Sequence, residues 1–433
     1  MARDSLYPVS VKAGKPILGM LPTGWQKLSL EKCLNIEARK AYIQDNQEYD
    51  LVTVKRSRGG VIRREHLKGK DISVKSQFYI KEGDFLISKR QIVHGACGLV
   101  PKELSGSIVS NEYCVLTGKS GFYLPYMEFL SESLYFQQTC FHSSIGVHIE
   151  KMIFKLDSWF KWPFNIPPLS EQKRIVKILS TWDKAISVTE KLLANSQQHK
   201  KALMQQLLTG KKRLLDENGV RFSGDWGKFT LSHFGKCIRG VSYKPENICE
   251  NESDNTIRLL RSTNIQNGEL NDKDLIILPK KLVKPMQVLM DGDLAICMAN
   301  GSKSLVGKSA PYKPNDADYT VGAFCALFRP LKSVSSSFVK FLFESNQYQS
   351  QLLVILAGSS INNLKGSDIE SINIDAPLHY KEQQKIAAVL SAADAEISTL
   401  EKKLACLRDE KKALMQQLLT GKRRVKVDEA VAV

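Results

Sequence analysis

Apolar residues recur every seven positions in two long stretches of this chain. In the second stretch one stripe contains Ile386, Ala393, Leu400, Leu407 and Leu414. In the first, the same stripe contains Ile175, Trp182, Thr189, Ser196 and Leu203 and is more polar in its middle. A companion stripe accompanies each, as the a and d positions of a coiled coil do. This companion stripe is the helix seam that we predict: Leu179, Ile186, Leu193, Lys200, Leu207, Leu390, Ile397, Leu404, Lys411 and Leu418.

Start and stop signals bound both predicted helices. Pro167-Pro168 and Pro377 precede them, and Thr209-Gly210 and Thr420-Gly421 follow, with glycine suited to a left-handed residue at a helix end. From Glu171 to Leu208 the first helix has 38 residues, which corresponds to roughly 57 Å. We expect the two helices to pack antiparallel.

The two stretches are copies of one another. Residues 200–211 (KKALMQQLLTGK) recur unchanged at 411–422, and 24 of 42 residues are identical between 171–212 and 382–423. Two copies do not make a solenoid, so the repeat predicts a pseudo-twofold molecule. Lys200 and Lys411 interrupt the same stripe, where a charge costs stability but fixes register and partner. The alternative is that each lysine extends along the edge of the seam into solvent.

The regions before each helix have a different pattern. Short apolar or β-branched runs alternate with turn residues at 49–54, 85–88, 275–278 and 294–298. Gly83-Asp84 and Gly292-Asp293 each precede such a run and are expected to form the turn before a strand. The predicted fold is α+β: two mixed α/β domains separated by two long helices in an antiparallel coiled coil. We divide the chain into a tail (1–20), first domain (21–169), first helix (170–212), linker (213–224), second domain (225–380), second helix (381–421) and tail (422–433).

Charge suggests the kind of partner. The chain has 62 Lys and Arg against 45 Asp and Glu, a net charge of +17. Such an excess is typical of proteins that bind polyanions through their phosphates, although a basic surface also serves solubility. Residues 55–90 contain eleven Lys or Arg and four acidic residues. This concentration within one variable region favours nucleic acid.

Several functional classes lack support. No apolar run is long enough to span a bilayer and the first residues lack a signal-peptide core, so we expect a cytoplasmic protein. Nine scattered cysteines without a C-x-x-C pair indicate reduced thiols. Cys140, His142 and His148 could suggest a metal, but a structural zinc needs a fourth ligand and none is obvious. We predict no metal site.

Two segments resemble nucleotide or base-binding motifs only in part. Gly301 to Ser309 (GSKSLVGKS) has five residues between its glycines where a P-loop has four, so we prefer a loop that offers polar groups to DNA. Asn165-Ile166-Pro167-Pro168 is close to the Asn-Pro-Pro-aromatic motif of amino-methyltransferases, but Ile166 breaks it and an extended lead-in to the helix is preferred. No hydrolase, nuclease or helicase signature is found. We therefore expect no catalytic residues.

The order of these features resembles a known family. PPLSEQKRIVKILSTWD and APLHYKEQQKIAAVLSAAD each join a variable region to a long helix, and they look like the two repeats of type I restriction–modification specificity subunits. The resemblance covers nearly the whole chain. It implies that 21–169 and 225–380 are target recognition domains, each of which reads one half of a bipartite, asymmetric DNA sequence. It also implies that the helices dock two modification (methyltransferase) subunits and, through them, the restriction subunits.

The same resemblance implies that S-adenosylmethionine, ATP and Mg²⁺ belong to partner subunits, with no cofactor in this chain. The helices then act as a ruler, and a 57 Å rod limits half-site separation to under roughly 17 base pairs. Two alternatives are a self-sufficient sequence-specific DNA-binding protein or regulator, and a single-chain methyltransferase or nuclease. Binding of S-adenosylmethionine by the purified chain would support the second.

Base-edge chemistry selects the candidate DNA-binding residues. Arginine suits guanine and Asn or Gln suits adenine, whereas lysines and hydroxyls mainly contact phosphates. For the first domain we select Arg56, Arg58, Arg63, Arg64, Lys89, Arg90 and Gln91. For the second we select Arg258, Arg261, Asn264, Asn300, Ser302, Lys303, Lys308, Ser360, Asn362 and Lys365.

Overall fold

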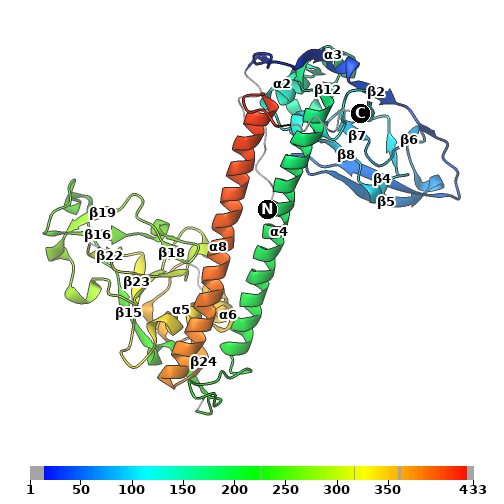
Figure 1. Ribbon diagram of the computed structural model, residues 1–433. Coiled ribbons are helices and arrows are strands. Elements are labelled where there is room, and N and C mark those ends of the chain that lie inside the picture. Colours follow the sequence, from blue (N-terminus) through cyan, green and yellow to red (C-terminus); the bar gives the residue numbers. More distant parts are fainter. Residues whose placement is uncertain (1–13, 225, 316, 359–361, 427–433) are drawn as a thin grey trace. The chain divides into compact units, whose positions relative to one another are not determined.

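The computed structural model describes residues 14–224, 226–315, 317–358 and 362–426. The chain forms two compact units, the first made of residues 1–190 and 403–433 and the second of residues 191–402. Each unit combines short strands with parts of both long helices (Figure 1). The predicted α+β class is confirmed.

The two long helices are α4 (Leu169–Leu207) and α8 (Tyr380–Leu419). The limits of α4 lie within two residues of the predicted Glu171 and Leu208. Gly210 and Gly421, with φ of +69° and +67°, follow the helices in the left-handed conformation. Glycine is favoured there because a Cβ atom would crowd the preceding backbone.

A four-stranded antiparallel sheet forms the centre of the first unit. Its strand order is β2 (Leu34–Glu37), β10 (Tyr113–Gly118), β7 (Phe85–Ser88) and β8 (Cys97–Leu99). All four residues of β7 are buried. A second sheet has the order β3 (Lys40–Ala41), β6 (Gln77–Tyr79), β9 (Ile108–Ser110), β4 (Glu48–Val54) and β5 (Val61–Lys68). In it β4 pairs parallel with β9 and antiparallel with β5.

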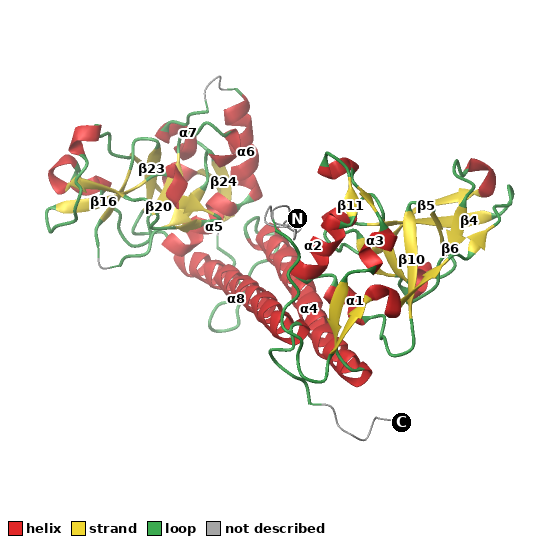
Figure 2. Ribbon diagram, turned by 90° about the horizontal axis from the view of Figure 1, so that it is seen from above, coloured by secondary structure: helices red, strands yellow, loops and turns green. Residues whose placement is uncertain are grey.

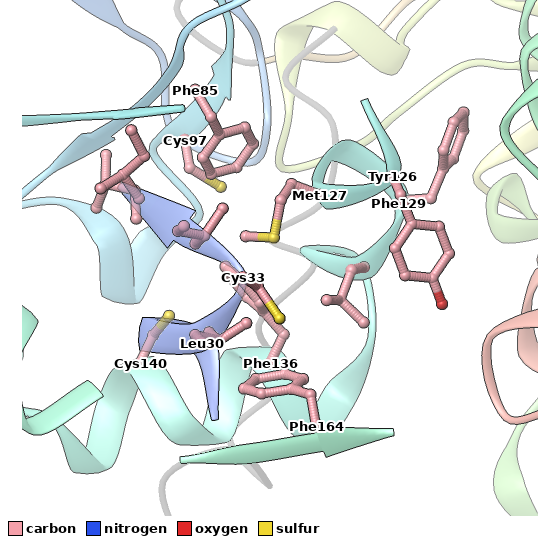
Figure 3. Packing of buried hydrophobic residues seen from close by; sticks show 14 of the residues in the cluster. Leu30, Cys33, Phe85, Cys97, Tyr126, Met127, Phe129, Phe136, Cys140 and Phe164 are labelled. Atoms are coloured by element: carbon pink, nitrogen blue, oxygen red, sulfur yellow. The ribbon is translucent and has the colours of Figure 1, made fainter. Parts of the chain in front are cut away.

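Short elements connect this sheet to α4. Strand β1 (Gln26–Ser29) pairs with β13 (Pro163–Ile166), the strand directly before α4. Strand β11 (Ser144–Ile145) pairs with β12 (Ile153–Phe154). The short helices are α1 (Tyr126–Leu130), α2 (Leu134–His142) and α3 (Leu156–Phe160). Their apolar side chains cover the sheet, and in Figure 3 Met127 points from α1 toward the strands that carry Phe85 and Cys97.

The core of the first unit also includes both long helices. Ile175 and Leu179 of α4 and Met415 and Leu418 of α8 are at most 9% exposed and belong to the same apolar cluster as Phe85. Fully burying an aliphatic or aromatic side chain contributes about 1.5–3 kcal/mol. The first unit is therefore stabilised by residues from near both ends of the chain.

The second unit has the same central sheet. Its order is β15 (Gly235–Arg239), β23 (Cys325–Pro330), β20 (Leu294–Cys297) and β21 (Ser309–Pro311). Strand β14 (Trp226–Thr230) pairs with β24 (Asn373–Pro377) as β1 pairs with β13. Three helices lie beside these strands in Figure 2: α5 (Ser336–Glu344), α6 (Asn346–Ala357) and α7 (Gly366–Glu370).

The outer strands of the second unit differ from those of the first. They are β19 (Ile276–Pro279), β16 (Thr256–Leu260) and β22 (Tyr319–Val321), with the hairpin β17 (Ile265–Gln266) and β18 (Glu269–Leu270). A parallel pair, β16 with β22, again occurs beside an antiparallel one. The central sheet is thus common to the two units, whereas the outer strands are rebuilt.

Candidate nucleic-acid interface

A buried aspartate holds the turn before the central strand of each unit. Asp84 accepts a hydrogen bond from the Lys81 amide at 2.7 Å, and Asp293 accepts one from the Met290 amide at 2.8 Å. Gly83 and Gly292 have φ of +80° and +85°, as the predicted turns require. Arg39 pairs with Asp84 and Arg329 with Asp293. Arg39 lies in the connection between β2 and β3, whereas Arg329 lies on β23, so the repeat does not reveal them.

The loop after this strand is held by matching backbone bonds in both units. In the first unit the Lys89 amide donates to the Glu112 carbonyl at 2.9 Å, and the Phe154 amide donates to the Lys89 carbonyl at 2.9 Å. In the second the Met298 amide donates to the Phe324 carbonyl at 2.9 Å. The amide of Leu364 donates to the Met298 carbonyl at 2.8 Å. We call residues 89–95 and 298–307 the reading loops.

The first reading loop meets the tip of the β4–β5 hairpin. The Ser57 amide donates to the His94 carbonyl at 2.7 Å, and the Arg58 amide donates to the Gly95 carbonyl at 2.9 Å. Ser57 and Arg58 have φ of +53° and +52°. Two consecutive non-glycine residues in this conformation are strained, and such strain concentrates at functional sites. The hairpin tip therefore has a fixed shape beside the loop.

Ion pairs orient Arg56 and Arg90 in this region. Arg56 pairs with Glu150 at 2.6 Å, and the same carboxylate lies 3.2 Å from His94. Arg90 pairs with Glu112 through two nitrogens, at 2.5 and 3.3 Å. A guanidinium fork held by one carboxylate still presents further N–H donors. The structure thus places Arg56, Arg58, Lys89, Arg90 and Gln91 in one region, although the Arg58 guanidinium donates to the Ser131 carbonyl at 3.1 Å.

Arg63 and Arg64 lie elsewhere, on the edge strand β5. Arg63 pairs with Asp50 at 2.8 Å and Arg64 with Glu65 at 3.4 Å. Charged residues along an edge strand oppose pairing with a second chain. This role explains both arginines without requiring a contact to DNA.

The second reading loop meets two other segments of the second unit. The amide of Asn300 donates to the Asn362 carbonyl, and Asn362 Nδ2 donates to the Gly301 carbonyl, both at 3.3 Å. Asn300 Oδ1 accepts from the Ser302 amide at 2.9 Å, and its Nδ2 lies 3.4 Å from Ser262 Oγ. Three distant segments therefore bring Arg261, Asn300, Ser302 and Asn362 into one region.

Other selected residues of the second unit have structural partners. Arg258 is held by Glu252 at 2.8 Å and by the Tyr319 hydroxyl at 2.9 Å. Asn264 is 1% exposed and donates to the carbonyls of Asn271 and Lys273 at 3.0 and 2.7 Å. Its side-chain amide holds the turn at Asn271 and Lys273 from the buried side, so we remove Asn264 from the candidate interface.

The remaining selected residues vary in position. Lys303 is exposed on the second reading loop, and Lys308 is exposed directly after it. Lys365 precedes α7, where its amide donates to Asp368 at 2.7 Å. Ser360 lies outside the described residues.

The partly matching motifs have ordinary structural explanations. The segment Gly301 to Ser309 returns into β21, antiparallel to β20, whereas a P-loop leads from a strand into a helix. Asn165 Nδ2 donates to the carbonyls of Gly19 and Met20, both at 3.1 Å. A ring nitrogen of His142 lies 2.8 Å from the Gly14 carbonyl oxygen. Among the described residues, no group of three or more His, Cys, Asp or Glu is arranged to hold a metal.

A lysine cluster joins the long helices within each unit. In the first, Lys411 of α8 pairs with Asp183 of α4 at 2.7 Å, lies 3.6 Å from Glu132 and sits over the Phe129 ring. In the second, Lys200 of α4 pairs with Asp394 of α8 at 2.5 Å and with Glu344 at 2.7 Å. Lys200 also lies over the Phe341 ring. The two lysines, 17% and 13% exposed at the side chain, do not extend freely into solvent.

An arginine clamp lies near the start of each long helix. Arg424 holds the buried Glu171 at 2.8 Å, and Arg213 holds the buried Glu382 at 2.6 Å. Each guanidinium also lies over a tryptophan, Trp25 or Trp226. The helices run antiparallel within each unit, because partners of later α4 residues lie earlier on α8: Asp183 pairs with Lys411 and Glu190 with Arg408 in the first unit, and Ser196 pairs with Glu396 and Lys200 with Asp394 in the second. The ten predicted seam residues are all buried or half-buried.

Sequence reasoning missed several residues of the region. Glu112, Glu150 and His94 orient the basic side chains, yet carboxylates and histidines gave no signal in a search for DNA-binding types. Phe324 is 71% exposed in the turn directly before β23. An aromatic directly after a Gly-Ala pair, ahead of an apolar strand, was the available signal.

No helix within the described part of the chain is long and apolar enough to cross a membrane.

A family model described as "Type I restriction modification DNA specificity domain" matches residues 22–195 and 223–407. The two matches begin at equivalent places in the repeat.

Curated relatives agree with this match. The EcoKI specificity subunit of Escherichia coli strain K12 is 36% identical over 197 residues, which cover 45% of this chain and 42% of the relative. The StySPI specificity subunit of Salmonella potsdam is 32% identical over 200 residues, covering 45% and 43%. Each alignment thus spans less than half of the relative's length.

Solved structures share the fold. A type I restriction–modification system S subunit from M. genitalium matches with a TM-score of 0.58 at 12% identity, covering 94% of this chain and 99% of that one. A chain from a study of type I R-M complex assembly matches with a TM-score of 0.53 at 20% identity, covering 93% and 98%. With two copies of its family model over most of its length, the chain belongs to the type I restriction–modification DNA specificity family.

Proposed function

We propose that this chain is the DNA sequence-specificity subunit of a type I restriction–modification complex. Each unit contacts one half of a bipartite, asymmetric target through its reading loop and the segments packed on it. The chain itself does no chemistry in this proposal. S-adenosylmethionine, ATP and Mg²⁺ act in partner subunits.

One observation carries the proposal: matching backbone bonds hold two reading loops of different chemistry. The first contains Lys89, Arg90 and Gln91, with Arg90 exposed, and the second contains Asn300, Ser302 and Lys303, with Ser302 and Lys303 exposed. A loop held rigidly by its scaffold can place side chains against base edges without ordering them on binding. Because the chemistries differ, the two units are expected to read different bases.

Methylation mapping of host DNA at base resolution, with and without this gene, tests the proposal. A split motif with a methylated base in each half, lost on deletion, is the expected result. Replacing Arg90 by alanine should relax the motif in one half only, and Asn300→Ala in the other half only. A methylome that does not change on deletion contradicts the role, as does purification of the native chain without modification subunits.

We further propose that α4 and α8 dock the modification subunits and set the gap between half-sites. The lysine clusters fix register within each unit, so a heptad inserted in both helices between the clusters preserves them. Suitable places are between Glu190 and Ser196 in α4 and between Glu396 and Arg408 in α8. These residues bound matching segments, because Glu190 pairs with Arg408 and Ser196 pairs with Glu396. Seven added residues lengthen a helix by about 10 Å, or about three base pairs of duplex.

The expected outcome is a methylated motif with the same two half-sites and a spacer longer by about three base pairs. A matched control inserts the heptad in α4 alone, which misaligns the seam and should abolish methylation. An unchanged spacer in the double-insertion variant contradicts the ruler. It leaves the recognition proposal intact, because both half-sites still appear in the motif.

A further inference from the structure

Phe324 is exposed beside the second reading loop. The ring is 71% exposed, although phenylalanine is among the residues most often buried. Its carbonyl accepts hydrogen bonds from the amides of Met298 and Ala299, at 2.9 and 3.1 Å. The residue therefore sits directly against the start of the second reading loop, two positions before Asn300.

The backbone around Phe324 is fixed. The Cys325 amide donates to the Gly322 carbonyl at 2.8 Å, and the Gly240 amide donates to the Cys325 carbonyl at 3.1 Å. A Cβ atom on Gly322 would lie 3.2 Å from the Leu259 side chain, so this turn is closely packed. An aromatic ring on a fixed turn loses little entropy on binding, because only its two side-chain torsions remain to be ordered.

The first unit has a different residue at the equivalent position. There the Lys89 amide donates to the Glu112 carbonyl, as Met298 does to Phe324. Glu112 in turn holds the Arg90 guanidinium. A residue needed only for the scaffold would keep its chemistry in both units. The residue type at this position instead changes together with the neighbouring loop residue. Glu112 stands beside Arg90 in the first unit, and Phe324 stands beside Ala299 in the second.

We propose that Phe324 is a specificity-determining residue that contacts the methyl group of a thymine in the half-site bound by the second unit. The inference rests on the proposed function and names the chemistry of one contact. Asn300 supplies an amide suited to adenine, and an apolar side chain suits the thymine methyl. An A·T pair presents both features in the major groove. The two residues together read this base pair.

A thymine-to-uracil scan tests the contact, since uracil removes only the methyl group. The complex of this chain with its modification subunits binds duplexes that carry the mapped target, with each thymine replaced in turn. The wild-type complex should lose about fourfold in affinity at one position of one half-site, the effect of one methyl-sized apolar group. The Phe324→Ala complex should bind the thymine and uracil duplexes equally at that position.

Two control variants assign the effect. Leu353→Ala removes an apolar side chain of similar exposure, 64%, from α6 of the same unit and should leave the uracil effect unchanged. Glu112→Ala should weaken discrimination in the other half-site and also keep the uracil effect. Phe324→Leu retains an apolar contact and should show an intermediate loss, which excludes misfolding as the cause in Phe324→Ala.

The outcomes separate this inference from the proposed function. If the wild-type complex binds its target specifically but no uracil substitution weakens it, the thymine contact is wrong and the recognition role stands. Equal uracil losses in wild type and Phe324→Ala also overturn the contact. If the complex shows no sequence preference in any duplex, the proposed function itself fails.

Discussion

The two units share a polar framework but differ in the sheet beside it. Each has a lysine cluster, an arginine clamp and a buried glutamine at the start of its long helix. The first unit adds a long β4–β5 hairpin, whereas the second adds the short β17–β18 hairpin and the β19–β16 pair. Side chains that join helices to the central sheet are therefore duplicated, and the segments free of that task have diverged.

The lysine clusters also differ in charge. In the second unit Lys200 and Lys340 face Asp394 and Glu344, so the four charges balance. Residue 340 corresponds to Glu128 in the first unit, where Lys411 alone faces Asp183, Glu132 and Glu128. Burial, together with the negative charges of Asp183 and Glu132, raises the pKa of Glu128. The duplicated framework thus carries one unbalanced copy.

Removing the clamp arginines should give the largest effect. Arg213→Ala is expected to destabilise the second unit by about 3–4 kcal/mol, because Glu382 at 1% exposure loses its counter-charge. Arg424→Ala should cost the first unit less, about 1–2 kcal/mol, since Arg424 is 43% exposed. There Glu171 also keeps the Trp25 indole N–H at 3.0 Å. Hydrogen exchange of peptides from each unit measures both losses.

A neighbouring exposed lysine provides the control for this pair. Lys212→Ala should change protection by under about 0.5 kcal/mol. Adding Trp25→Phe to Arg424→Ala should bring its loss close to that of Arg213→Ala. Equal losses in the two single variants would show that the indole does not matter.

The buried glutamines should show a smaller contrast. Gln172 bonds the Tyr123 amide and the carbonyls of Pro167 and Gly121, at 2.7, 2.8 and 3.1 Å. Gln383 bonds the Ser335 amide and the Pro377 carbonyl, at 3.0 and 2.8 Å. Alanine leaves these backbone groups without partners, which costs about 2 kcal/mol for Gln383 and up to about 3 kcal/mol for Gln172.

Denaturant unfolding of the full chain, read together with peptide hydrogen exchange, assigns each loss to its unit. Gln198→Ala, at an exposed position of α4, is the control and should be neutral. A greater loss for Gln383→Ala than for Gln172→Ala would contradict the count of bonds.

The charge imbalance predicts small pH effects of opposite sign. Because the pKa of Glu128 is raised in the folded state, the folded first unit binds more protons and gains stability as pH falls through that raised value. Burial alone would raise the pKa of Asp394, but hydrogen bonds from Lys200 and Lys340 lower it. The second unit therefore loses stability as pH falls below about 4, the ordinary range for Asp.

Exchanging the charges tests this explanation. Because the Glu128 residue is exposed and the Asp394 side chain is partly exposed, each effect should stay under about 1 kcal/mol. Glu128→Lys should stabilise the first unit at pH 7 and remove its gain at lower pH. Lys340→Glu should give the second unit the pH response of the first. Hydrogen exchange from about pH 2.5 to 7, corrected for intrinsic rates, measures both, and identical pH responses in the native units would refute the assignment.

The long helices could be predicted because their signal is local. The heptad stripes lie within α4 and α8, the flanking prolines and glycines lie close to their ends, and the same signal occurs in both copies of the repeat. Short strands such as β3 and β12 have two residues each, and the parallel pairing of β4 with β9 joins residues 51 and 108. No periodicity within a segment encodes such pairing.

The candidate interface could be predicted only in part, since residue type does not determine orientation. Arg90 and Asn300 lie on the reading loops and Arg56 lies beside the first, but Asn264 turns inward because its amide satisfies the carbonyls of a tight turn. Exposed Phe324 was overlooked because aromatic residues are first assigned to a core. Partners such as Glu112 become recognisable only when the fold brings them beside an arginine.

The arginine clamp of the first unit has a consequence for biosynthesis. The second unit is assembled from one uninterrupted stretch of chain, residues 191–402, whereas the first needs Arg424 to reach Thr23 and Glu171. A nascent chain leaving the ribosome therefore holds every residue of the second unit while the first still lacks the end of α8. Although its strands are translated first, the first unit is the last to be completed.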